Sequence, residues 1–136
     1  MPIKVLIADD NELMRTAIRR TLDEEPRIKV LGEASSFASA MQMIADLKPD
    51  VLLLDLHLPG KRDFTPAFVK SQLVSVNHTL AVSFSNDTDA QALANGYGAV
   101  TLLDKMRLYG EMIPAILECA HRADPRNATP DPRPTL

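Results

Sequence analysis

Four short, largely apolar runs, each followed by a residue that can bind a phosphate group or a metal ion, constrain the fold of this chain most strongly. The runs are residues 3–8, 51–54, 80–82 and 100–103. The polar residues that follow them are Asp9 and Asp10, then Asp55, then Ser83, and finally Lys105 after one intervening aspartate. Apolar runs of this length, separated by segments of helical period, predict the strands of a parallel sheet.

If these runs are strands of one sheet, their polar residues meet at its carboxyl edge, where open α/β sheets bind ligands. Three carboxylates at one edge repel one another and favour a bound cation. Each residue alone has an ordinary explanation, such as helix capping for Asp9 and Asp10 or an exposed charge for Lys105. Because all these explanations would have to hold together, we favour a single shared site.

Segments of helical period alternate with the runs and complete five βα units. We expect an edge strand at 28–34 and helices at 36–47, 65–74, 87–95 and 108–121, after a first helix capped by Asn11. In that first helix we expect Leu13, Ile18 and Leu22 to share the apolar face, and in the last helix we expect Pro114 to lie in the first turn. The units predict an α/β, doubly wound, three-layer sandwich of flavodoxin-like type, with a five-stranded parallel sheet in the order 2-1-3-4-5.

Length and composition predict one domain, at residues 1–122, followed by a proline-rich flexible tail or truncated linker at 123–136. The net charge of −3 provides no basic footprint for nucleic acid. No apolar stretch is long enough to span a membrane, and the single cysteine, Cys119, excludes an internal disulfide. We therefore expect a cytoplasmic protein.

Four segments carry a resemblance to a known family: Val5-Leu-Ile-Ala-Asp-Asp10, Asp50-Val-Leu-Leu-Leu-Asp-Leu-His-Leu-Pro-Gly60, Val82-Ser-Phe-Ser85 and Gly98-Ala-Val-Thr-Leu-Leu-Asp-Lys105. With these segments the chain resembles the response-regulator receiver domain of the CheY-like superfamily. Because it has no proline after Lys105, the chain is most similar to receivers of the LuxR/NarL type.

The resemblance implies a phosphoacceptor in a two-component or phosphorelay pathway, which is not a metabolic enzyme. It implies Asp55 as the acceptor, Asp9, Asp10, Asp55 and the backbone carbonyl of His57 as Mg²⁺ ligands, and Lys105 and Ser83 as partners of the phosphoryl oxygens. The implied protein partners are a sensor histidine kinase or phosphotransfer protein. A homodimer through the face of the fourth helix, fifth strand and fifth helix is a further expectation.

Other interpretations compete with this one. Leu102 stands where the family commonly has an aromatic residue, and Asp63 stands where it usually has glycine. A pseudo-receiver, which has the same fold but acts as a phosphorylation-independent interaction module, is therefore the main alternative. Asp55-Leu-His-Leu-Pro-Gly60 also matches the Asp-x-His-x-x-Gly signature of cobalamin-binding domains, but it follows the third strand instead of the first. A dehalogenase-type phosphatase would carry its nucleophile at the first strand in an Asp-x-Asp pattern.

Overall fold

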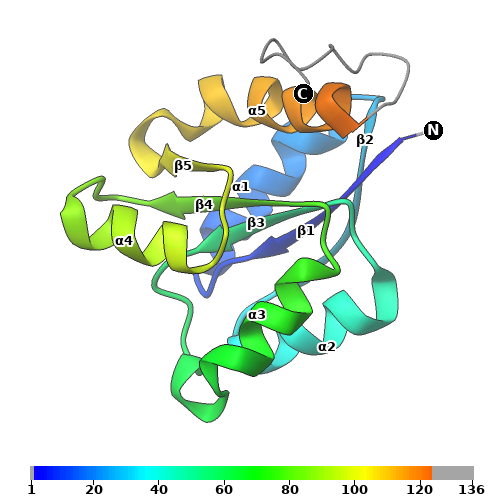
Figure 1. Ribbon diagram of the computed structural model, residues 1–136. Helices are drawn as coiled ribbons and strands as arrows, with labels where there is room; N and C mark the ends of the chain where they lie inside the picture. The colour runs from blue at the N-terminus through cyan, green and yellow to red at the C-terminus, as the bar shows by residue number, and fades with distance from the viewer. Residues whose placement is uncertain (1, 124–136) are drawn as a thin grey trace, which may run out of the picture.

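The computed structural model describes residues 2–123, in which strands and helices alternate along the chain (Figure 1). The strands are β1 (Ile3–Ala8), β2 (Ile28–Ala34), β3 (Val51–Asp55), β4 (His78–Ser83) and β5 (Thr101–Asp104). The helices are α1 (Glu12–Asp23), α2 (Phe37–Leu47), α3 (Pro66–Val74), α4 (Thr88–Gly96) and α5 (Leu108–Ala123). Two short 3-10 helices, η1 (Lys61–Asp63) and η2 (Lys105–Arg107), precede α3 and α5.

All strand pairs are parallel, and the sheet order is β2-β1-β3-β4-β5. The predicted fold class and strand order are therefore confirmed. This order makes β1 and β3 neighbours and places β2 at an edge, as its mixed polarity indicated. The point where the chain reverses its direction across the sheet lies between β1 and β3, next to the predicted acidic residues.

Side chains alternate between two apolar layers because successive residues of a strand point to opposite faces. One layer joins Leu6, Leu52 and Leu54 to the buried faces of α2, α3 and α4. The other joins Val5, Ile7 and Leu53 to α1 and α5, and Figure 1 shows these two helices on the same side of the sheet. The residues between the helices and the sheet form the core, which leaves the carboxyl edge of the sheet for polar groups.

Side-chain caps begin four of the helices, and the sequence predicted the one at Asn11 as a cap. Asn11, Ser36, Thr65 and Asp87 each accept a hydrogen bond from the backbone N–H three residues later. Each cap satisfies one of the backbone donors that a helix leaves unpaired at its start. Strand and helix ends otherwise differ from the expected ones by one or two residues. Ala123, the first residue of the expected tail, ends α5, and the rest of that tail lies outside the described residues.

Two details of the expected helices are wrong. Leu13 does not join the apolar face of α1, since it is 82% exposed whereas Leu22 is fully buried. Nine residues separate them, which is about two and a half helical turns and places them on opposite sides. Pro114 lies in the second turn of α5, not in the first. Both Pro114 and Gly110, whose carbonyl loses its helical partner, are exposed, so water can satisfy that carbonyl.

No helix among the described residues is long and apolar enough to cross a lipid bilayer.

The contrast within α1 gives a direct test of the packing. We expect Leu22→Ala to lower the free energy of unfolding by about 2–5 kcal/mol, because it leaves a cavity between α1 and the sheet. Leu13→Ala is the matched control on the same helix, and its effect should stay within about 0.5 kcal/mol. Urea denaturation followed by circular dichroism measures both; equal losses would contradict the assigned faces of α1.

Candidate functional site

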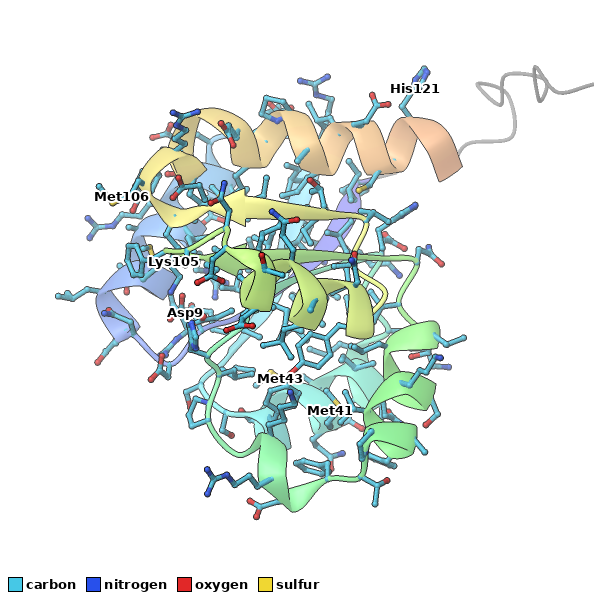
Figure 2. All side chains as sticks on the ribbon, turned by 60° about the vertical axis from the view of Figure 1, so that its left-hand side comes forward. Asp9, Met41, Met43, Lys105, Met106 and His121 are labelled. Atoms are coloured by element: carbon cyan, nitrogen blue, oxygen red, sulfur yellow. The ribbon has the colours of Figure 1, made fainter. Side chains whose placement is uncertain are left out.

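The residues that follow the strands come together at one edge of the sheet. The register pairs Ala8 with Leu54, Asp55 with Val82, and Ser83 with Asp104. Asp9, Asp55, Ser83 and Lys105 therefore leave β1, β3, β4 and β5 at nearly the same level. In Figure 2, Asp9 and Lys105 are labelled at this edge, close to each other. The clustering that was predicted on the assumption of one parallel sheet is present in the structure.

Three carboxylates form the acidic part of the site. Asp9, Asp10 and Asp55 each offer an oxygen, and these oxygens lie within 4.8 Å of one another. Asp9 and Asp55 are buried, whereas Asp10 is exposed. Burial weakens the screening by water, so the negative charges repel each other more strongly than they would at the surface. The arrangement thus requires positive charge nearby.

Lys105 supplies that positive charge within the protein. Its Nζ lies 2.9 Å from Oδ2 of Asp9 and 3.2 Å from Oδ2 of Asp55. The side chain is itself buried, at the start of η2 directly after β5. Burial by itself would lower the pKa of Lys105, but the hydrogen bond to Asp9 and the charges of Asp55 and Asp9 outweigh it. The net effect raises the pKa, so the ammonium stays charged in the folded protein.

Backbone donors hold the other oxygens of the two buried carboxylates. Oδ1 of Asp9 accepts from the N–H of Asn11 at 2.9 Å, and Oδ1 of Asp55 accepts from the N–H of His57 at 2.9 Å. Each buried carboxylate therefore directs one oxygen to the backbone and the other to Lys105. This division fixes the plane of Asp55 and leaves Oδ2 as the oxygen that contacts the Lys105 ammonium. The side chain of His57 is exposed.

Ser83 and Phe84 form the side of the site next to β4. Ser83 is buried, and its Oγ accepts from the N–H of Ser85 at 3.1 Å. Phe84 is 63% exposed, and its ring centroid lies 4.9 Å from Nζ of Lys105. A cation is attracted to an aromatic face at this distance. Phe84 is not among the site residues predicted from the sequence, although its place directly after Ser83, at the end of a strand, was an available signal.

The replacement of glycine by Asp63 causes no backbone strain. Asp63 belongs to η1, and Lys48 is the one non-glycine residue with a positive φ among those described. The left-handed position in this loop is occupied by Gly60, with φ of 94°. The turn after Asp55 therefore keeps a glycine where the backbone requires it, three residues before Asp63.

Known proteins share the fold of this chain. Residues 5–116 match the family model of the response regulator receiver domain. The chain therefore belongs to the response regulator receiver domain family. The receiver domain of the putative response regulator NarL from Mycobacterium tuberculosis has the same fold, with a TM-score of 0.76 and 28% identity over 88% of this chain and 96% of that one.

Full-length relatives extend beyond this chain. The probable transcriptional regulatory protein NarL of Mycobacterium tuberculosis is 32% identical over 90% of this chain, which covers 56% of that protein. A protein-glutamate methylesterase/protein-glutamine glutaminase of Cereibacter sphaeroides is 35% identical over 94% of this chain, which covers 37% of that protein. The chain thus spans between about a third and a half of these relatives and corresponds to a receiver domain within them.

The ion pairs of Lys105 can be tested by a double-mutant cycle. Lys105→Met should lower the free energy of unfolding by about 3–5 kcal/mol, because it leaves two buried carboxylates without a counter-charge. The double variant Lys105→Met/Asp55→Asn should lose less unfolding free energy than the sum of the two single losses. The difference, which is the interaction energy of the pair, should be about 0.5–3 kcal/mol. Urea denaturation at neutral pH measures the cycle, and additive effects would show that Nζ and Asp55 do not interact.

The difference in unfolding free energy between wild type and Lys105→Met should depend on pH in a defined way. The pKa of Lys105 is raised on folding because the charged ammonium interacts favourably in the folded state. This interaction stabilises the folded protein fully at every pH below the pKa of lysine in the unfolded chain, which is about 10.4. That contribution is lost as the pH rises through the higher pKa of folded Lys105. The stability difference between wild type and Lys105→Met should therefore be constant from neutral pH to about pH 9 and shrink above about pH 10.4. A difference that shrinks on acidification to pH about 6 instead would contradict this pairing.

Proposed function

We propose that this chain is a phosphoacceptor receiver, in which Asp55 takes a phosphoryl group from a histidine kinase or phosphotransfer protein. The observation that carries the proposal is the direct contact of Lys105 with a buried Asp55 inside an acidic cluster. A buried carboxylate held by a backbone N–H and a lysine is oriented for reaction with an electrophile. A purely structural carboxylate would not require two further acids beside it, because each adds repulsion.

The donor set fits Mg²⁺, which prefers oxygen ligands and keeps several waters. Asp10, Asp55 and the backbone carbonyl of His57 would hold the ion, with Asp9 bound directly or through water. The exposure of Asp10 and the 4.8 Å grouping of the carboxylate oxygens support this assignment. When bound, the ion neutralises charge between the carboxylates and a phosphoryl group.

The chain's own residues then position the transfer. A carboxylate oxygen of Asp55 attacks the phosphorus of a phosphohistidine in line, the new O–P bond forms as the P–N bond breaks, and the imidazole leaves. Lys105, already 3.2 Å from Oδ2 of Asp55, would pair with a phosphoryl oxygen. The hydroxyl of Ser83 would donate to another, since its Oγ accepts from the N–H of Ser85 and its own hydrogen can still be donated. A movement of Ser83 toward the phosphoryl group would alter the β4–α4 loop and thereby the surface.

Further parts of the proposal concern the whole protein. Residues 1–122 would be the receiver and 123–136 a tail or linker, in a protein whose output is either an interaction or an attached domain. A cytoplasmic location is a further part of the proposal, because it would suit transfer from a histidine kinase or phosphotransfer protein. Pairing of two copies through α4, β5 and α5 stays a prediction. The pseudo-receiver alternative is not favoured, although Leu102 replaces the usual aromatic residue, because Asp55 and Lys105 are both present and in contact.

Phosphorylation by a small donor tests the acceptor. Incubation with acetyl phosphate and Mg²⁺ should add one phosphoryl group to the wild type, measured as intact mass, because Asp55 is oriented and Lys105 offsets the incoming charge. Asp55→Asn should gain none, whereas the matched control Asp63→Asn, exposed in the neighbouring η1, should label like the wild type. Equal labelling of wild type and Asp55→Asn would refute the assignment.

Metal binding can be measured through stability. A ligand that binds only the folded state stabilises it, by about 1.4 kcal/mol at a concentration ten times Kd. The thermal midpoint should therefore rise as Mg²⁺ is added to the wild type. It should rise much less in Asp10→Asn, which removes an exposed ligand with little effect on packing. Asp46→Asn, an exposed acid on α2, is the matched control and should behave like the wild type; a loss of response there would point to nonspecific charge effects.

A further inference from the structure

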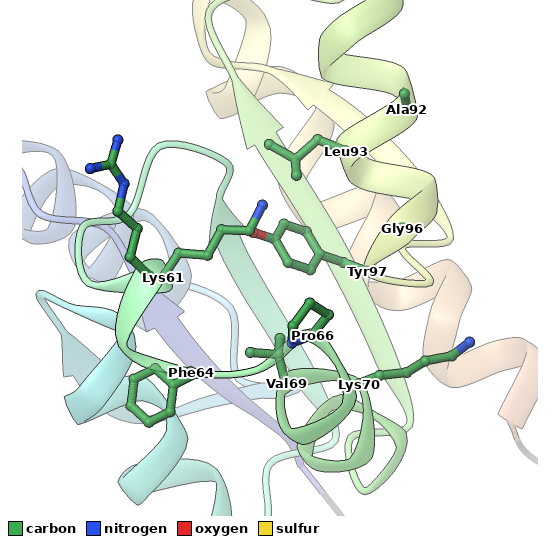
Figure 3. Close-up of a pocket in the computed structure, with 10 residues that line it drawn as sticks. Lys61, Phe64, Pro66, Val69, Lys70, Ala92, Leu93, Gly96 and Tyr97 are labelled. Carbon is green, nitrogen blue, oxygen red and sulfur yellow. The ribbon is translucent and has the colours of Figure 1, made fainter.

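A second cavity lies away from the acceptor site, between α4 and the segment that joins β3 to α3. It has a volume of about 560 Å³ and opens between η1, the start of α3 and the last turn of α4 (Figure 3). It shares no lining residue with the carboxylate cluster. The volume falls in the range of small-molecule sites, roughly 300–1,000 Å³.

The walls of this cavity combine apolar surface with positive charge. Phe64 after η1, Val69 of α3 and Leu93 of α4 supply apolar surface. Lys61, Arg62 and Lys70 supply positive charge, and none of the described residues that line the cavity carries a carboxylate. Three cations around an apolar hollow, without a counter-charge in its lining, complement a ligand that is both apolar and anionic.

Tyr97 forms the floor and is the independent observation that points to a ligand. Its side chain is buried, at 8% exposure, and its hydroxyl has no hydrogen-bond partner among the described residues. A buried donor left unpaired is unfavourable, so native structures rarely keep one without a reason. Nζ of Lys61 lies 5.1 Å from the centroid of the Tyr97 ring, and Figure 3 shows the lysine side chain extended toward this ring. The Lys61 ammonium thus lies over the Tyr97 ring, and both residues line the cavity.

We propose that this cavity binds a small organic anion, with an apolar ring or chain against Phe64, Val69 and Leu93 and an acidic group between Lys61 and Tyr97. The acidic oxygen would accept a hydrogen bond from the Tyr97 hydroxyl and pair with the Lys61 ammonium. Lys70 and Arg62 would attract the anion from the rim. The site is separate from the acceptor chemistry and does not depend on it.

Anilinonaphthalene sulfonate is a suitable probe, because it joins two aromatic rings to one anionic group. Its fluorescence should rise on binding at one site per chain, and the amide NMR signals of Phe64, Gly96 and Tyr97 should shift in proportion. Phenylnaphthylamine, which keeps the rings and lacks the sulfonate, should bind at least about tenfold more weakly if charge recognition directs the binding. Added salt should weaken the binding of the sulfonate and leave the affinity for the neutral compound unchanged.

Three variants identify the contacts. Lys61→Met keeps most of the apolar stem and removes the charge, so it should weaken the sulfonate about fivefold. Tyr97→Phe removes only the hydroxyl and should also weaken it, by about three- to fivefold. Lys29→Met, which removes an exposed lysine from β2 outside the cavity, is the matched control and should leave the affinity within about twofold. Melting curves for each variant verify that it is folded.

The outcomes separate this site from the acceptor site. Asp55→Asn should bind the probe like the wild type, so a failure of phosphorylation and a failure of this cavity are distinguishable. Equal affinities for the charged and neutral compounds would overturn the proposal. So would NMR shifts centred on residues outside the cavity, or an unchanged affinity in both Lys61→Met and Tyr97→Phe.

Discussion

The contact of one lysine with two buried aspartates is the interaction on which the rest of this structure depends. Lys105 lies within 3.2 Å of carboxylate oxygens from both Asp9 and Asp55, and so joins the ends of β1, β3 and β5 through a single ammonium. Without that charge, two buried carboxylates would repel each other in surroundings where water screens them poorly. The strands can therefore end in acids at one edge only because η2 returns a cation to the same place.

The same contact explains how the site can react to a change of charge. Each buried carboxylate keeps one oxygen on a backbone N–H, which fixes its orientation, and shares the other with Lys105. A cation or a phosphoryl group that enters the site alters the balance at the shared oxygens first. Lys105 also touches the exposed ring of Phe84 in the β4–α4 loop. A shift of the Lys105 ammonium would therefore change its contact with the ring of Phe84, which is exposed at the surface next to Ser83.

Sequence patterns predicted much of this arrangement, and their failures have physical causes. The alternation of apolar runs with helical segments led to the five βα units, and the need to gather Asp9, Asp55 and Lys105 led to the observed strand order. Leu13 was misplaced because apolar character alone does not say which side of a helix is covered. Pro114 was misplaced because exposure of Gly110 relieves a cost that a sequence pattern assigns to every internal proline. Phe84 was missed because an exposed aromatic residue has no periodic signature.

The sequence by itself determined which side chains reach the carboxyl edge, because parallel strands of similar length end at the same level. It also determined the helix starts, since capping acts over three residues of chain. Only the tertiary structure decided which oxygen of each aspartate meets Lys105. It also decided that the Tyr97 hydroxyl, beside a cationic cavity, is buried without a hydrogen-bond partner among residues 2–123. Those features depend on distances between segments far apart in the chain, which are set by how the helices pack against the sheet and not by local spacing.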